Sequence, residues 1–306
     1  MIYYVSKPEL KSNENISSEN NKIFKIFKPG YKFPSISISG TNCELSCAHC
    51  GGHYLKHMQT ADSPAQLLEM CINLSKRKAN GVLISGGCNQ SGYVMLDKYF
   101  ETLKEIKQKT DLILNVHTGL VTKQQAKRIA RSQIDVVSCD LVGDSGTIKK
   151  VFGLPYSTLE YQDSMKVLMD AGIKKVVPHI CLGLDFGEII GEFNAIDIVS
   201  KFKAPEMIFI VLIPTIGTRM AEIKPTKIYR IIETIQYAKS TLNDTQLYLG
   251  CMRPRSYRFR KYNNELELAA IKAGIDGIVL PSKSTREWLT KNNFEYRVHD
   301  TCCSVL

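Results

Sequence analysis

Three cysteines close together in the chain are the residues best suited to hold a metal group. Cys43, Cys47 and Cys50 fall within the segment Cys43-Glu-Leu-Ser-Cys47-Ala-His-Cys50. Thiolates are the usual ligands of iron–sulfur clusters. This spacing lets one tight loop bind three of the four iron atoms of a 4Fe–4S cluster, which leaves the fourth iron open to another ligand. The segment therefore predicts a cluster that takes part in chemistry.

Other uses of these thiols stay open from the spacing alone. Structural zinc is normally held by four ligands, often in Cys-x-x-Cys pairs, and His49 and His53 are near enough in sequence to add to the three cysteines. The chain has ten cysteines. In a reducing compartment, that content indicates metal or redox chemistry rather than a disulfide framework.

Alternating short apolar runs and amphipathic segments are the elements that must position these residues. We expect strands at 35–39, 81–85, 112–117, 134–140, 175–183, 207–214, 247–251 and 277–280. We expect helices between them, among which the clearest are 64–78, 123–132, 161–172 and 226–240.

This alternation predicts an α/β fold, a (β/α)8 TIM-type barrel over residues 35–292. A doubly wound open sheet is the alternative. Barrel active sites lie at the carboxyl ends of the strands, where several polar residues of this chain fall. Residues 1–34 are expected to be a polar extension, and residues 293–306 a tail that carries Cys302 and Cys303 over the barrel mouth.

Composition bounds the class of protein. The 306 residues are 44% hydrophobic, and no run approaches the roughly 20 apolar residues that span a membrane. The polar start does not resemble a signal peptide, so we expect a soluble cytoplasmic protein without membrane contact. The net charge of +10 fits either a solvated surface or attraction to an acidic partner. No nucleic-acid motif is present, and the dense basic group is Arg253, Arg255, Arg258 and Arg260.

The cysteine segment, at the end of the first predicted strand, resembles the cluster loop of the radical S-adenosylmethionine (SAM) superfamily. The resemblance implies that SAM binds the open iron through its amino and carboxylate groups. It also implies that an electron passed to the sulfonium breaks a C–S bond and gives a 5′-deoxyadenosyl radical. Cys43, Cys47 and Cys50 are thus the expected catalytic and cluster-binding residues, with a 4Fe–4S cluster and SAM as cofactors.

The same resemblance assigns SAM contacts near the first two strands. His49 stands where the superfamily usually has an aromatic residue that packs near the adenine. Ser85-Gly86-Gly87 ends the second predicted strand, where the superfamily binds the SAM amino group, often with Gly-Gly-Glu. Cys88 replaces the acidic residue, so backbone carbonyls would make the contact. A purely structural turn is the alternative for these glycines.

Further candidate contacts end the third and fourth strands. Asp140 is a carboxylate that would accept hydrogen bonds from the ribose hydroxyls, and Ser138 lies beside it. His117 ends the third strand and is a candidate SAM contact. The alternatives are an Asp that caps the next segment and a packed barrel His.

Residues 35 to 285 resemble biotin synthase, most clearly from strand four through strand five and in LIPTIGTRM (212–220). Biotin synthase holds a second cluster inside the barrel with three cysteines and an arginine. Arg253 falls at the place of that arginine, but strand three reads Asn-Val-His117, and only Cys181 lies near an expected ligand position.

The segments 39–58, 83–92 and 250–255 resemble more closely the archaeal-type, two-protein lipoyl synthases, which are biotin-synthase-like. This resemblance implies a sulfurtransferase that inserts sulfur into an octanoyl chain on a lipoyl carrier protein. It also implies a second, paired radical SAM protein. A ferredoxin-like protein is the expected electron donor.

A second set of cysteines is a candidate source of that sulfur. Cys251 ends predicted strand seven, and Cys302 and Cys303 lie on the tail. We hypothesise that they bind an auxiliary 4Fe–4S cluster, with Ser304 or Arg253 as a fourth contact. The alternatives are an inert tail, or prenylation at Cys303-Ser-Val-Leu306, although the upstream polybasic run that usually accompanies it is missing.

Three other functions remain open at this point. A radical SAM isomerase or lyase, of the methylornithine-synthase or hydrogenase-maturation type, shares the barrel and needs no second cluster. A biotin-synthase-like enzyme would use its own substrate. A non-catalytic iron–sulfur scaffold or redox sensor would need no SAM pocket, so Ser85-Gly86-Gly87 and Asp140 argue against it.

Overall fold

The structure, a computed structural model, describes residues 23–306. Its eleven strands form one sheet in which all neighbouring strands run parallel. The strands are β1 (Phe24–Phe27), β2 (Ser35–Ser37), β3 (Gln59–Thr60), β4 (Gly81–Ser85), β5 (Ile113–His117), β6 (Val136–Asp140), β7 (Val176–Leu182), β8 (Glu206–Val211), β9 (Gln246–Leu249), β10 (Gly277–Val279) and β11 (Tyr296–His299).

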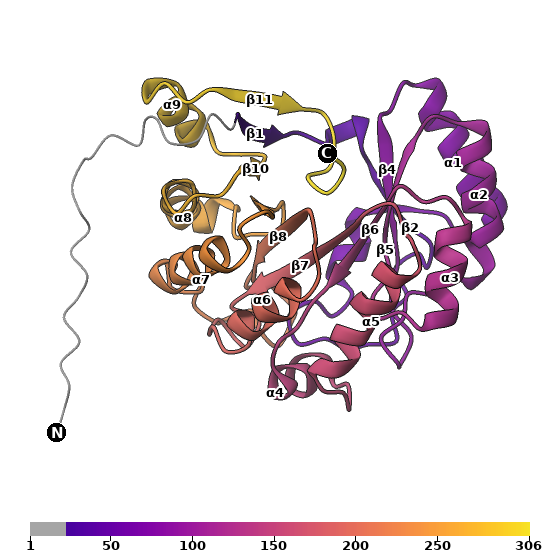
Figure 1. Ribbon diagram of the computed structural model, residues 1–306, viewed down its shortest axis with the longest axis horizontal. Coiled ribbons are helices and arrows are strands. Elements are labelled where there is room, and N and C mark those ends of the chain that lie inside the picture. Colours follow the sequence, from indigo (N-terminus) through magenta and orange to yellow (C-terminus); the bar gives the residue numbers. More distant parts are fainter. Residues whose placement is uncertain (1–22) are drawn as a thin grey trace.

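The helices lie on the outer, convex side of the curved sheet (Figure 1). They are α1 (Pro64–Lys76), α2 (Phe100–Lys109), α3 (Lys123–Arg131), α4 (Ser145–Thr147), α5 (Thr158–Asp170), α6 (Glu192–Ser200), α7 (Ile228–Thr241), α8 (Arg260–Lys272) and α9 (Lys283–Lys291). The four helices predicted from the sequence are present within three residues of their expected bounds. Capping boxes fix the starts of two of them, with Thr122 and Gln125 at α3 and Ser157 and Glu160 at α5.

The sheet is a half-barrel rather than the closed eight-stranded barrel that we predicted. Its strand order is β11-β1-β10-β9-β8-β7-β6-β5-β4-β2-β3. Among the described residues, no ladder joins β10 to β2, because β10 pairs with β1 on its free side. All eight predicted strands are present. Apolar periodicity identifies strands but does not tell which edges meet, which is why closure was predicted wrongly.

The segment expected to be a polar extension contributes β1. Phe24, Ile26 and Phe27 are buried, and β1 lies between β10 and β11. The strand is short and flanked by lysines, so its periodicity was too weak to reveal it. The rest of the predicted extension, residues 1–22, lies outside the described part of the chain.

The tail after β11 enters the concave side of the sheet (Figure 1). The carbonyl oxygen of Asp300 accepts a 2.9 Å hydrogen bond from Nδ2 of Asn80, and Leu306 accepts one from Nζ of Lys175. Asn80 and Lys175 precede β4 and β7, so these contacts are at the amino-terminal ends of the strands. The tail therefore closes the end opposite to the mouth that it was expected to cover.

Two layers of apolar side chains hold this architecture together. The outer layer lies between sheet and helices and consists of one cluster with Leu67 and Leu103 and a larger one with Ile231 and Leu266. A smaller layer fills the concave side, where Cys303 of the tail packs with Phe27, Val136, Val177, Ile208, Tyr248 and Val279. No helix within residues 23–306 is long and apolar enough to cross a membrane.

Candidate active site at the carboxyl ends of the strands

The three cysteines Cys43, Cys47 and Cys50 lie on the loop after β2, at the carboxyl end of the sheet. A tight turn closes this loop, because the backbone N–H groups of Cys50 and Gly51 both donate to the carbonyl oxygen of Cys47, at 3.2 and 3.0 Å. The Sγ atom of Cys43 accepts a 3.4 Å hydrogen bond from the backbone N–H of Cys88, in the loop after β4. The loop thus presents its thiols beside the next strand end.

The electrostatics of the loop suit a bound cation. Burial, followed by the proximity of Cys50 and Cys43, raises the pKa of the Cys47 thiol to about 12. A positively charged metal group would favour the thiolates that burial and crowding disfavour. Among residues 23–306, no three His, Cys, Asp or Glu side chains are arranged as around a single metal ion. Ligands of a cluster bind different iron atoms and need not converge so closely.

The predicted glycine segment packs directly against the cysteine loop. A Cβ atom on Gly87 would lie 2.0 Å from the carbonyl oxygen of Asn42 and 2.6 Å from Cα of Cys43. The backbone N–H of Gly87 also donates a 2.7 Å hydrogen bond to Oγ of Ser39. Glycine is required here for contact between two loops of the protein, and Gly86 is less crowded, with 3.2 Å to Ile38. The side chain of Ser85 donates to the carbonyl oxygen of His117.

A carboxylate and two imidazoles form the polar part of the mouth. Nε2 of His117 lies 3.3 Å from Oδ1 of Asp140, and the rings of His117 and His179 are 6.0 Å apart. Burial opposes ionisation of Asp140, but His117, His179 and His49 outweigh it and bring its pKa to about 2. Burial, with His117 nearby, lowers the pKa of His179 to about 4. Asp140 is therefore an anionic acceptor at neutral pH, as binding of ribose hydroxyls requires.

His49 is a half-buried residue within the cysteine loop. Its ring meets Phe152 edge to face, with 5.6 Å between centroids. Its Nδ1 atom is buried and has no hydrogen-bond partner in the described part of the chain. Burial lowers the pKa of His49 to about 4, so the ring is neutral at pH 7. An unsatisfied buried nitrogen beside the cysteine loop fits a site that is completed by a ligand with its own polar atoms.

Ser138 belongs to a polar cluster deeper inside the sheet than we predicted. Its hydroxyl donates a 2.9 Å hydrogen bond to Oδ1 of Asn115 and lies 3.4 Å from Oγ of Ser304. Nδ2 of Asn115 contacts Sγ of Cys302 at 3.7 Å. Ser138 points to the same side of β6 as Asp140, but one step further from the mouth. It binds the tail rather than lining the mouth.

The second cysteine set is brought together only in part. Cys251 lies two residues beyond the end of β9, and desolvation, followed by the charge of Cys302, raises the pKa of its thiol. Cys302 is partly exposed on the concave side of the sheet. Cys303 is 4% exposed and packs in the inner apolar cluster. Ser304 is fully buried against Ser138. Both tail cysteines thus lie on the concave side of the sheet, with Cys303 in the inner apolar cluster and Cys302 packed against it.

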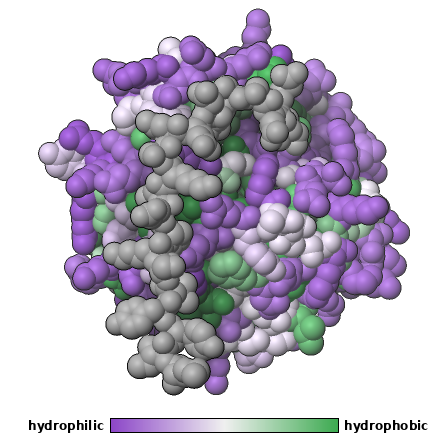
Figure 2. Space-filling model, turned by 60° about the vertical axis from the view of Figure 1, so that its left-hand side comes forward, coloured by the Kyte–Doolittle hydropathy of each residue, from purple (hydrophilic) through white to green (hydrophobic). Residues whose placement is uncertain are grey.

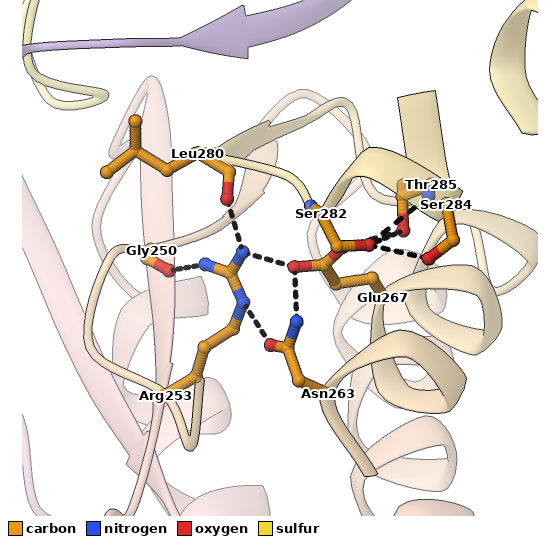
Figure 3. A network of polar contacts seen from close by, with 8 residues as sticks. All are labelled: Gly250, Arg253, Asn263, Glu267, Leu280, Ser282, Ser284 and Thr285. Carbon is orange, nitrogen blue, oxygen red and sulfur yellow. Dashed lines mark hydrogen bonds and ion pairs between the residues drawn. The ribbon is translucent and has the colours of Figure 1, made fainter. Parts of the chain in front are cut away.

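Arg253, one of the two residues considered as a fourth contact of the auxiliary cluster, is engaged in hydrogen bonds within the protein. It is buried, and Nε donates to Oδ1 of Asn263 at 3.0 Å while one terminal nitrogen donates to the carbonyl oxygen of Gly250 at 2.6 Å. The other terminal nitrogen donates to Glu267 at 2.5 Å and to the carbonyl oxygen of Leu280 (Figure 3). This network joins the ends of β9 and β10 to α8. The guanidinium group of Arg253 thus makes its hydrogen bonds to other groups of the protein.

Two residues near the site were not found from the sequence. Asn115 is a fully buried amide in the middle of an apolar strand. A single polar residue within an apolar run could have indicated a buried hydrogen-bonding role from the sequence. Tyr54 follows the cysteine loop, and its hydroxyl lies 2.7 Å from Oγ1 of Thr215 in the loop after β8. Tyr54 therefore ties two sides of the mouth together.

Solved structures of other proteins have a similar fold. The hydrogenase maturase HydG matches with a TM-score of 0.61 at 14% identity, covering 91% of this chain and 65% of that one. Methylornithine synthase (PylB) matches with a TM-score of 0.58 at 14% identity, covering 86% and 74%. At this identity the likeness shows the fold alone, which agrees with the half-barrel.

Curated relatives carry the sequence similarity. Biotin synthase of Methanococcus vannielii is 30% identical over 157 residues, 49% of this chain and 46% of the relative. Biotin synthase of Flavobacterium psychrophilum is 23% identical over 231 residues, 71% and 61% of the two chains. The chain thus spans between about half and three fifths of the length of these relatives. Residues 37–190, which hold the cysteine loop, the glycine segment and Asp140, match the radical SAM superfamily, and the chain belongs to this superfamily.

Proposed function

We propose that the protein is a radical SAM sulfurtransferase of the lipoyl synthase type, which inserts sulfur into an octanoyl chain on a carrier protein. The observation that carries the proposal is a second set of cysteines, Cys251 after β9 and Cys302 on the tail that packs on the concave side, on elements other than the cysteine loop. A rearrangement or cleavage reaction would need no such group.

The residues of the mouth have distinct tasks in this proposal. When bound, the cluster on Cys43, Cys47 and Cys50 together with SAM supplies the radical that removes a hydrogen atom from an unactivated carbon. Asp140 holds the ribose, and His49 contacts the adenine. Gly86 and Gly87 present backbone carbonyls to the amino group. The inner apolar cluster and the tail keep water away from the reacting carbon.

Cys251, Cys302 and Cys303 are the proposed ligands of an auxiliary 4Fe–4S cluster that serves as the sulfur source. Cys303 would have to leave the inner apolar cluster to take part, so assembly of the cluster would reshape the tail. Ser304 is the proposed fourth contact. The saturated hydrogen bonds of Arg253 leave it a structural role instead.

The proposed partners follow from this reaction. They are an octanoylated lipoyl carrier protein or domain, a second paired radical SAM protein and a ferredoxin-like electron donor. The test is anaerobic incubation of the reconstituted protein with SAM, a reductant and an octanoyl-lysyl peptide, with and without the paired protein. The proposal predicts a thiolated octanoyl product by mass spectrometry. Its absence under conditions that produce 5′-deoxyadenosine would contradict the proposal.

A biotin-synthase-like reaction is the second candidate, because the curated relatives above carry that name. It uses the same radical and the same kind of sulfur insertion on a different acceptor. Offering the biotin precursor in the same assay separates the two, since a thiolated product would appear with one acceptor only. 5′-Deoxyadenosine without sulfur in either acceptor would favour an isomerase or lyase, and no 5′-deoxyadenosine would favour a scaffold or sensor.

A further inference from the structure

A dense basic segment lies beside the mouth, directly after the loop that carries Cys251. Arg255, Arg258, Arg260 and Lys261 fall within seven residues, and all four are exposed. No acidic residue occurs between positions 254 and 264. The segment follows β9 at its carboxyl end, on the same side of the sheet as the cysteine loop. We name residues 255–261 the arginine segment.

Within the described part of the chain, the basic side chains of the arginine segment have no carboxylate partners. Elsewhere, Arg128 pairs with Asp97 at 2.6 Å and Arg230 pairs with Glu233 at 2.5 Å. Two guanidinium groups of the segment lie instead over aromatic rings, Arg258 over Phe259 and Arg260 over Tyr257.

The backbone that presents these charges is held rigidly. Arg253 anchors the start of the segment through Gly250, Leu280 and Glu267 (Figure 3). Phe259 is 8% exposed and anchors its middle. A charged surface that is ordered before binding loses less conformational entropy when a partner docks.

The chemistry of the segment specifies its partner. Tyr257 is 86% exposed and stands among the arginines in the sequence. The face shown in Figure 2 is mostly hydrophilic, with small apolar areas between the hydrophilic residues. Exposed Arg and Tyr together are typical of the central contacts of protein interfaces. A nucleic-acid backbone would be bound along a basic surface longer than these seven residues.

We propose that the arginine segment is the docking surface for an acidic protein domain that delivers the acyl substrate to the mouth. This inference rests on the proposed function, because that function requires a protein-bound chain. Positive charge at the rim speeds and orients the encounter with an acidic surface, and Tyr257 supplies an apolar contact. The carrier would thereby be held next to the carboxyl end of β9, at the loop that carries Cys251.

The test compares Arg255→Gln/Arg258→Gln/Arg260→Gln with a matched control, Lys76→Gln/Arg77→Gln/Lys78→Gln. The control removes three exposed positive charges after α1, at the opposite end of the strands. Binding of an octanoylated lipoyl domain is measured by titration at low and moderate salt. We expect the triple arginine variant to bind about tenfold more weakly at low salt and to lose most of the salt dependence. The control should bind like the wild type.

Turnover of a short octanoyl-lysyl peptide separates docking from chemistry. The arginine variant should process the peptide at the wild-type rate while losing turnover of the carrier. Equal weakening in the control, unchanged carrier binding, or no carrier binding by the wild type would overturn the proposal. So would displacement of the carrier by a short oligonucleotide, or a defect seen only with ferredoxin and not with dithionite. If the wild type binds the carrier through this segment but thiolates no octanoyl substrate, the docking surface stands and the proposed function fails.

Discussion

Nε2 of His117 lies 3.3 Å from Oδ1 of Asp140, where the neighbouring strands β5 and β6 end at the mouth. The pair links the polar part of the candidate SAM site to the sheet itself, since both residues are the last of their strands. The position and ionisation of this carboxylate therefore depend on the fold of two strands and on one imidazole.

The His117–Asp140 pair makes stability depend on pH in a defined window. The pKa of Asp140 is about 2, below its ordinary 3.8, so its contribution is present above about pH 4 and is lost as the pH falls towards 2. Burial lowers the pKa of His117, but Asp140 outweighs this and raises it above 6.5. The His117 contribution is therefore present below pH 6.5 and is lost as the pH rises through the raised value.

Asp140→Asn should accordingly lower the melting temperature of the cluster-free protein more at about pH 5.5 than at about pH 9. Asp97→Asn, which breaks an exposed pair with Arg128, is the control and should show no such difference. Thermal unfolding followed by circular dichroism gives both values. An Asp140→Asn effect of equal size at the two pH values would show that the pair is not formed as described.

The cysteine loop and the second set of cysteines should hold iron independently. After anaerobic reconstitution, the Cys43→Ala/Cys47→Ala/Cys50→Ala variant should keep about four iron atoms and lose all SAM cleavage. Adding Cys251→Ala and Cys302→Ala should remove that iron. Cys71→Ala, at a fully buried core position, is the control and should change neither. Near-zero iron in the first variant would contradict the auxiliary cluster and favour a reaction that needs none.

Gly87 should tolerate no side chain because it lies in close contact with the cysteine loop. A Cβ atom 2.0 Å from the carbonyl oxygen of Asn42 forces the two loops apart, at a cost of about 1–3 kcal/mol. Gly87→Ala should therefore lose most of its cluster, measured as iron and sulfide per chain. Gly86→Ala, with 3.2 Å to Ile38, should keep it. Equal cluster content in the two variants would argue against this contact.

Arg253 should behave as a structural residue and not as a cluster ligand. Arg253→Met leaves the buried carboxylate of Glu267 without its partner, which typically costs about 3–5 kcal/mol of unfolding free energy. Arg253→Met/Glu267→Leu should recover much of that loss, since it removes both buried charges. Chemical denaturation measures the stabilities. If the double variant is stable but has lost the second set of iron atoms, the arginine is a ligand after all.

Most strands of the sheet could be predicted from the sequence, but the pairing of its edge strands could not. Apolar runs such as 81–85 and 207–214 are strong enough to predict β4 and β8, because a strand buried on both faces needs a continuous apolar run. Nothing in these runs tells that β10 pairs with β1, which joins residues more than 240 positions apart. The four-residue β1 is also too short to show periodicity.

Within the site, the positions on loops at strand ends were predictable and the inner contacts were not. Cys43, Cys47 and Cys50 are recognisable by their close spacing on the loop after β2, and Asp140 because it ends β6. Ser138 is two residues from Asp140 on the same face, and only the presence of the tail decides that it binds Asn115 and Ser304. The tail itself has little apolar periodicity, so its entry from the amino-terminal side could not be inferred.

The fate of one hydrogen atom tests most directly whether a radical reaction takes place on the octanoyl chain. An octanoyl-lysyl peptide deuterated along the acyl chain is incubated anaerobically with the reconstituted protein, SAM and a reductant, and 5′-deoxyadenosine is analysed by mass spectrometry. A radical reaction on the octanoyl chain predicts that the 5′-deoxyadenosine carries a single deuterium, and that the Cys47→Ala variant makes none. 5′-Deoxyadenosine that forms without deuterium, in the presence of the paired protein as well as in its absence, would contradict a radical reaction on the octanoyl chain.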